Sequence, residues 1–374
     1  MTDHNYLTIH FLTALPFHNL NRDERGLPKQ TRQGGSIRGL LSSQSIKHAA
    51  RARYELAAAK FGDRPSARSR DLAKEAVARA VIIAEASGAS LDTVAALKRA
   101  TAVLSSFTTQ PTKPKAAKPG KNGEAAEAEP KPEEKDTVLW LSSDEIDALA
   151  ELLLFDADIN RDDIVVPGRT LSLPIACFGR MTAYAPTSGT EAAIAVGPAI
   201  TTHPITIDVD YFTAVDDLAV AGAAHLNQAL YTSGVYYHAL TIDKQQLRRS
   251  WSGWDLADAD FRILECVRAL ILALPQGKKN STAADILPSL IIAEQQQYRT
   301  TASFEAAVAP GPGGGYLESS AAALVDQLER SRAFDPDEFG DTTVSGLNPE
   351  LGGGIGQAAN LSGLADGILA WLRA

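Results

Sequence analysis

Residues 34–53 read Gly-Gly-Ser-Ile-Arg-Gly-Leu-Leu-Ser-Ser-Gln-Ser-Ile-Lys-His-Ala-Ala-Arg-Ala-Arg, a glycine-rich segment that runs into a helical pattern. Ser42 occupies the position of a helix N-cap, and Leu41 and Ile46 have the spacing of a hydrophobic staple around it. Glycine tolerates the backbone conformations of tight turns. The pattern therefore predicts a loop followed by a helix over residues 42–59.

The wider segment from Asn19 to Arg53 is the basic pole of the chain. It holds eight Lys and Arg residues and two acidic ones, a net charge of +6 in a chain whose formal net charge is -9. Exposed backbone N–H groups and helix N-termini favour anions, and Lys47 and Arg51 share one helix face. The segment predicts a phosphate-binding surface. The alternative is a glycine-rich turn followed by an ordinary amphipathic helix with solvated charges.

The composition is that of an ordinary globular protein. Of 374 residues, 45% are hydrophobic and 22% are charged, which allows a large core. No apolar run approaches the length of a membrane span and the N-terminus lacks a signal-peptide pattern, so we expect a cytoplasmic protein. Cys177 and Cys266 form neither a disulfide framework nor a metal cluster. We expect no metal and no cofactor.

The first half of the chain predicts one strand and several helices. Asn5 to Leu15 alternates in polarity, with Leu7, Ile9 and Phe11 on one face, as in a half-buried strand. Residues 66–108 predict two helices divided near Gly88, and residues 143–155 predict another helix opened by an N-cap at Ser143. Between them, residues 111–135 lack aromatic and β-branched apolar residues. They predict a disordered or mobile loop.

The second half supplies the remaining strands. It predicts strands at 171–184, 191–197, 234–242 and 285–293, and helices at 261–274, 317–331 and 361–372. Without the helical insertion the order is βαββαβ, which is typical of a ferredoxin-like, RNA-recognition-type domain. The fold class is therefore α+β.

Several motifs resemble one known family. They are Leu20-Asn21-Arg22-Asp23, Ser42-Ser43-Gln44-Ser45-Ile46-Lys47 with Arg51, Gly179-Arg180-Met181, and the segment from Ala199 through Asp210-Tyr211-Phe212-Thr213-Ala214-Val215-Asp216-Asp217-Leu218 to Leu226. Together they are similar to the backbone (CasC-family) subunit of the type I-E CRISPR Cascade surveillance complex. The resemblance covers roughly residues 5–55 and 170–245.

The resemblance implies a hand-shaped subunit. Its ferredoxin-like palm would comprise residues 1–60, 169–199 and 232–374, with a helical finger insertion at 61–168 and a thumb at 200–231. Such subunits are not enzymes. They polymerise head to tail along the CRISPR RNA and present the guide for pairing with target DNA in antiviral defence, beside the other Cascade subunits.

The resemblance also assigns site residues. The RNA phosphates and sugars would be held independently of sequence by Arg22, Lys29, Gln44, Lys47, Arg51, Arg180, Lys278 and Lys279. A wedge that displaces bases at regular intervals would consist of Met181, Phe212, Thr213, Val215 and Leu226. By spacing alone, Phe212 and Val215 fit the core of a small subdomain better than a wedge, and it is the resemblance that favours the wedge.

Two alternatives involve histidine. His18 and His48 lie near Lys and Arg, as a metal-independent endoribonuclease that processes CRISPR RNA would require for general acid–base catalysis. Asp216 and Asp217 could form a metal pair with His203 and His225 as further ligands, but no third carboxylate or metal-spaced partner is evident. The non-catalytic RNA-binding subunit remains the favoured interpretation.

Overall fold

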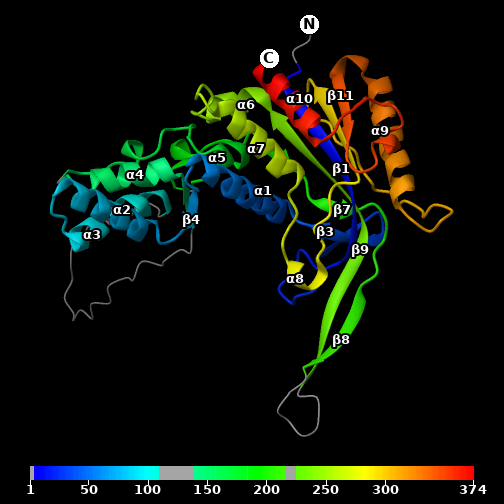
Figure 1. Ribbon diagram of the computed structural model, residues 1–374, viewed down its shortest axis with the longest axis horizontal. Helices are drawn as coiled ribbons and strands as arrows, with labels where there is room; N and C mark the ends of the chain where they lie inside the picture. The colour runs from blue at the N-terminus through cyan, green and yellow to red at the C-terminus, as the bar shows by residue number, and fades with distance from the viewer. Residues whose placement is uncertain (1–3, 109–137, 156, 183, 215–224) are drawn as a thin grey trace, which may run out of the picture. The chain divides into compact units, whose positions relative to one another are not determined.

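The computed structural model describes residues 4–108, 138–155, 157–182, 184–214 and 225–374 (Figure 1). The predicted loop at 111–135 lies outside these residues. The chain forms two units. Unit 1 comprises Met1–Asp63, Ala193–Arg248 and Trp254–Ala374, and unit 2 comprises Arg64–Ala192 and Arg249–Gly253.

A large, mostly antiparallel sheet forms the framework of unit 1. The strands run in the order β12-β11-β10-β1-β9-β7-β3-β2, and β6 and β8 also pair with β9. Among the described strands of this sheet, β12 alone pairs in parallel, with β11. The strands are β1 (Tyr6–His18), β2 (Gln30–Gln33), β3 (Ser36–Leu41), β6 (Ile194–Val196), β7 (Ala199–Thr201), β8 (Asp208–Ala214), β9 (His225–Asp243), β10 (Leu290–Gln296), β11 (Phe339–Ser345) and β12 (Gln357–Ala358).

Both faces of the central strand β1 are buried. Leu7, Ile9 and Phe11 occupy one face, and on the other Leu12 packs in a cluster with Leu324 and other residues of α9 (Leu317–Phe334). The prediction of a half-buried strand is therefore wrong. The alternation in the sequence is real, but α9 covers the polar face as well.

Buried hydrogen bonds satisfy the polar residues under α9. The Nδ1 atom of His10 forms a hydrogen bond with the Tyr237 hydroxyl at 3.0 Å, and its Nε2 atom lies 3.2 Å from Glu294 Oε2. Arg332 also pairs with Glu294. Burial alone would raise the pKa of the Glu294 carboxyl, but His10 and Arg332 outweigh it and hold that pKa below its ordinary value. These side chains therefore fill the sheet face without leaving an uncompensated charge.

The helix after the basic segment forms as expected. In α1 (Ser43–Ala58), Ser42 is the N-cap and accepts a hydrogen bond from the Ser45 N–H, and Leu41 and Ile46 are both buried. Helix α1 contacts α7 (Ala259–Ile271), and α7 contacts α10 (Leu361–Arg373) (Figure 1). Two shorter helices, α6 (Lys244–Ser250) and α8 (Lys279–Thr282), also follow β9.

The glycine-rich segment forms a β-hairpin rather than an open loop. Strands β2 and β3 pair up to Gln33 and Ser36, so Gly34 and Gly35 are the two residues of the turn, with φ values of +55° and +76°. Two consecutive positive φ angles characterise a type I′ turn, which favours glycine. The glycines therefore serve the hairpin geometry.

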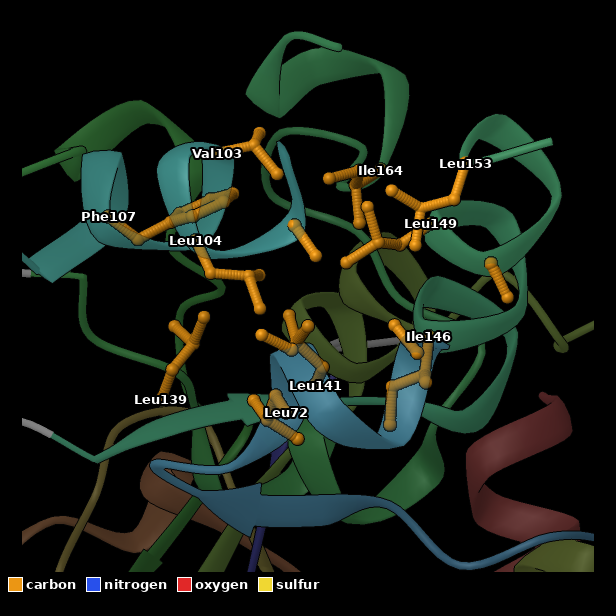
Figure 2. Close-up of a cluster of buried hydrophobic side chains, with 14 of the residues drawn as sticks. Leu72, Val103, Leu104, Phe107, Leu139, Leu141, Ile146, Leu149, Leu153 and Ile164 are labelled. Carbon is orange, nitrogen blue, oxygen red and sulfur yellow. The ribbon is translucent and has the colours of Figure 1, made fainter. Parts of the chain in front are cut away.

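Unit 2 is mainly helical. It contains α2 (Leu72–Ser87), α3 (Thr93–Thr108), α4 (Ser143–Leu152), α5 (Leu173–Phe178) and a small sheet of β4 (Ala67–Ser69) with β5 (Leu139–Leu141). Figure 2 shows its core, in which Leu104, Leu141, Ile146 and Leu149 pack together. Gly88 ends α2 with a φ of +69°, as the sequence predicted. The N-cap of α4 is Ser142, one residue before the predicted Ser143.

Three predicted strands differ from the structure. Residues 171–184 contain the helix α5, because Ser172 caps its start and Pro174 fits its first turn. The strand predicted at 191–197 is limited to β6. The strand predicted at 285–293 begins at Leu290, after Pro288, which lacks an N–H for the ladder. The α+β class, with its large antiparallel sheet, is confirmed.

Candidate nucleic-acid interface

Asn19 connects three parts of unit 1 at the end of β1. Its side-chain amide donates to the carbonyl oxygen of Gly26 at 3.0 Å and to that of Leu230 at 2.9 Å. Gly26 lies in the basic segment and Leu230 lies in β9. A single buried side chain therefore holds the basic segment against the strand that leads into the β8–β9 hairpin.

Asn21 connects the same segment to the start of α1. Its Oδ1 accepts hydrogen bonds from the Ser42 N–H at 2.9 Å and the Ser45 hydroxyl at 3.4 Å. Asp23 closes the turn that follows, because its Oδ1 accepts from the N–H groups of Arg25 and Leu27, each at 2.9 Å. The N-terminus of α1 and the turn at 22–29 are thus fixed to each other.

Several predicted RNA-binding side chains gather on this part of unit 1. Arg22 and Gln44 are exposed, and Lys29 and Lys47 are half-buried. Within the described residues, no carboxylate pairs with Arg22, Lys29 or Lys47. Unpaired cations close together favour a polyanionic ligand.

Arg51 differs from these cations. Its Nε lies 3.2 Å from the Glu55 carboxylate one helical turn further along α1. The intrahelical ion pair partly neutralises its charge, so Arg51 offers less to an anion than Lys47 does.

A third segment reaches the end of β1 through Gly277. Its N–H donates to the Leu20 carbonyl at 3.0 Å, and a Cβ at this position would lie only 2.3 Å from that oxygen. The next residue, Lys278, places its ammonium 5.2 Å from the centroid of the Tyr231 ring. Lys279 is exposed. The close approach that glycine permits therefore brings the two lysines to the basic segment.

Arg180 lies in unit 2, where it is buried and paired with another side chain of the protein. Its side chain is 1% exposed and forms an ion pair with Glu145, with Nη1 and Oε2 2.5 Å apart. The same Nη1 donates to the Trp140 carbonyl at 3.2 Å. The carboxylate of Glu145 neutralises the buried guanidinium through Nη1, whereas Nε and Nη2 have no hydrogen-bond partner among the described residues. This burial sets Arg180 apart from the cations on the surface of unit 1.

The wedge residues are distributed over both units. Met181, in unit 2, is 92% exposed, and Phe212 and Thr213 are exposed on β8 of unit 1. The hairpin of β8 with β9 pairs from Asp208 opposite Tyr231 to Ala214 opposite His225. Val215 lies outside the described residues, as does the side chain of Leu226. Phe212 is accordingly a surface side chain of a two-stranded hairpin.

The two histidines considered for acid–base catalysis, His18 and His48, differ in exposure. His18 is buried, its Nδ1 accepts from the Leu20 N–H at 3.3 Å, and desolvation lowers its pKa from 6.5 to about 4. His48 is exposed on α1. A buried neutral histidine is poorly placed to exchange protons with a ribose hydroxyl.

His203 has no free ring nitrogen. Its Nε2 accepts from the Val235 N–H at 3.1 Å and its Nδ1 donates to the Pro204 carbonyl at 2.8 Å, while the ring stacks on Tyr316. Asp216 and Asp217 lie outside the described residues. The described part of the chain contains no group of three potential metal-ligating His, Cys, Asp or Glu residues.

Arg38 belongs to the basic pole by sequence but not by position. It is fully buried and donates to the carbonyl oxygens of Thr201 at 2.8 Å and Glu305 at 3.3 Å. Desolvation lowers its pKa, although the charge of Glu305 opposes that effect. The positive surface therefore carries less charge than the sequence count suggests.

The model of the CT1975-like protein family, a Cas family, matches residues 7–355. The chain belongs to this family. Its structure is also similar to a chain of a "CRISPR RNA-guided surveillance complex, pre-nicking", with a TM-score of 0.74, 25% identity, and coverage of 98% of this chain and 99% of that chain.

A second solved chain has the same fold as this protein. It comes from a "CRISPR RNA-guided surveillance complex", with a TM-score of 0.59, 21% identity and coverage of 98% of both chains. No curated protein matches the sequence. No helix in the described residues is long and apolar enough to span a membrane.

The residues that assemble the site were not predicted from the sequence. Asn19 and Asn21 flank Leu20 and hold the basic segment to β9 and α1, and Phe17 and Tyr231 stack beside them. The closely spaced asparagines after a strand are a signal for side-chain to backbone bonding in turns. Their long-range partners, however, follow only from the folded arrangement.

Proposed function

We propose that the chain is a non-catalytic, cytoplasmic backbone subunit of a CRISPR RNA-guided surveillance complex, of the type I-E class that its motifs resemble. It binds CRISPR RNA, polymerises head to tail with further copies of itself beside other Cascade subunits, and presents the guide to target DNA for antiviral defence. The observation that carries the proposal is the structural likeness over 98% of the chain to a subunit of such a complex.

The arrangement of unit 1 supports a ferredoxin-like palm. The strands β10, β1, β9 and β7 are neighbours in that order, and α1 and α7 lie in the two connections of the βαββαβ pattern. The finger insertion at 61–168 would lie mostly in unit 2, and the thumb at 200–231 would include β8 and the part of β9 that pairs with it.

The proposed RNA contacts are mainly to the backbone. Arg22, Lys29 and Lys47 are available cations, and Gln44 and the Lys278-Lys279 segment accompany them. Cations and amides that contact phosphates and sugars hold RNA without regard to its sequence. A subunit that must accept every guide needs this kind of recognition.

Salt dependence tests the phosphate contacts. We expect Arg22→Ala with Lys47→Ala to weaken binding of unrelated single-stranded RNAs equally and to reduce the slope of log affinity against log salt by roughly 1.4, about 0.7 for each lost contact. The measurement is fluorescence anisotropy at several salt concentrations. An unchanged slope would show that these cations face solvent only.

The matched control removes the same charges elsewhere in unit 1. Lys60 follows α1 and Arg248 lies in α6, and both are exposed. Lys60→Ala with Arg248→Ala should keep the wild-type slope. A control that lowers the slope as much as the test variant would mean that net charge, not the proposed site, governs binding.

The thumb hypothesis predicts a stable but defective subunit. Phe212 is 48% exposed, so Phe212→Ala should leave the melting temperature of the free subunit unchanged while the periodic base displacement in the assembled complex fades. Chemical probing of the RNA bases measures the second effect. The comparison is Phe11→Ala, which removes a fully buried ring and should cost about 3–5 kcal/mol. A similar loss at Phe212 would identify it as a core residue.

The ribonuclease alternative has a direct test. The exposed His48 is the remaining candidate for acid–base chemistry, because His18 is buried. We expect no defined product when the protein is incubated with labelled CRISPR repeat RNA without metal. A product that disappears in His48→Ala would replace the non-catalytic proposal.

A further inference from the structure

An exposed aromatic ring lies at the end of β1, two residues before Asn19, which joins the basic segment to β9. Phe17, near the end of β1, is 45% exposed, although rings of this size are usually covered in a folded domain. One face of the ring stacks on Tyr231 of β9, with centroids 4.2 Å apart and an angle of 27° between the planes. Phe17 and Tyr231 thus form a stacked pair whose outer member remains accessible.

The inner half of this pair is rigidly supported. Tyr231 is 6% exposed, and the neighbouring Leu230 carbonyl accepts the hydrogen bond from Asn19. Lys278 lies over the Tyr231 ring, held nearby by the bond between Gly277 and Leu20. A ligand that binds Phe17 therefore need not order the residues beneath it, which lowers the entropic cost of binding.

The surrounding charges indicate the class of ligand. Asn19 joins Tyr231's strand to the turn that carries Arg22 and Lys29, and Lys278 adds a third cation. An aromatic face beside several cations is the combination that binds single-stranded nucleic acids, because bases stack on the ring and phosphates pair with the cations. An apolar peptide segment would gain nothing from the cations.

We propose that the exposed face of Phe17, backed by Tyr231, stacks a nucleobase of the bound single-stranded RNA. The inference rests on the proposed function and adds a base contact to a site otherwise built for phosphates. Stacking tolerates every base, because each has a planar π-face. The platform therefore adds affinity without making the subunit sequence-specific.

The test compares variants at position 17. Phe17→Ala and Phe17→Leu should each weaken binding of the full-length protein to a labelled single-stranded RNA about tenfold, as is typical for one stacked base. Phe17→Trp should restore it. The salt slope should stay at the wild-type value, because the phosphate contacts remain. Leu keeps apolar packing against Tyr231, so it separates stacking from folding.

An RNA with abasic residues provides the decisive comparison. Its phosphates are intact but it offers no base to stack, so Phe17→Ala and wild type should bind it equally. Phe334→Ala is the matched control, since this ring is 89% exposed on α9, and it should bind like wild type. A Phe17→Ala loss that persists on abasic RNA would overturn the platform.

The outcomes separate this inference from the proposed function. If Arg22→Ala with Lys47→Ala weakens binding but Phe17→Ala and Phe17→Leu do not, the platform is wrong and the RNA-binding function stands. If the wild-type protein binds no single-stranded RNA, both are wrong. Weaker binding by Phe17→Ala alone, with Phe17→Leu at the wild-type level, would show that position 17 serves packing.

Discussion

Glu145→Ala should lower the free energy of unfolding of unit 2 by about 3–5 kcal/mol, the usual cost of removing one partner of a buried ion pair. Glu145 pairs with the buried Arg180, and its carboxylate also accepts the Ser142 N–H at 2.8 Å in the capping box of α4. Its loss leaves the Arg180 guanidinium buried without a counterion and removes the Glu145 half of the capping box, while the Ser142 hydroxyl still accepts the N–H of residue 145. Chemical denaturation, with hydrogen exchange of residues 139–152 as a local readout, measures the effect.

Two variants make this prediction specific. Glu151 is exposed on the same helix, so Glu151→Ala should change the stability of unit 2 by less than about 0.5 kcal/mol. Glu145→Leu combined with Arg180→Met removes both charges and should recover part of the loss, because apolar replacements avoid the desolvation of an ion pair. If Glu145→Ala is as stable as the Glu151→Ala control, the buried Arg180 does not need Glu145 as its counterion.

The local signals in the sequence predicted much of the fold. Ser42 with the Leu41–Ile46 staple fixed the start of α1, and Gly88 fixed the end of α2, because caps depend on residues a few positions apart. Residues 171–184 were wrongly predicted as a strand. Helix α5 within them is short and buried on every side, so its apolar residues show no helical periodicity.

The candidate site was less accessible to sequence reasoning. The cations at 22, 29 and 47 followed from charge clustering, but Arg38 could not be told from them, since its burial depends on carbonyl groups more than 160 residues away. Lys278 joins the site through the bond between Gly277 and Leu20 and through its own contact with the Tyr231 ring. Long-range contacts of this kind decide which charges remain at the surface, and no local pattern encodes them.

Acidification should destabilise unit 1 between pH 6.5 and pH 4. Burial lowers the pKa of His18 and of His238 from 6.5 to about 4 in the folded protein. In this window the unfolded chain binds protons that the folded protein excludes, so stability falls as the pH falls. The stabilisation is complete above pH 6.5, and its full loss, at pH 4, is roughly 3 kcal/mol for each histidine.

His238→Phe isolates one of these two contributions. His238 stacks on Phe11 with ring centroids 4.4 Å apart, so a phenylalanine can keep the contact without a titrating group. Calorimetric melting from pH 8 to pH 4 should show a smaller loss of stability in this variant than in wild type, while His18 and His203, whose pKa values are also lowered by burial, still exclude protons. His48→Phe, at an exposed position on α1, should keep the wild-type pH dependence. If His238→Phe also keeps it, His238 takes up its proton in the folded state, and the desolvation of its ring cannot be the source of the acid sensitivity.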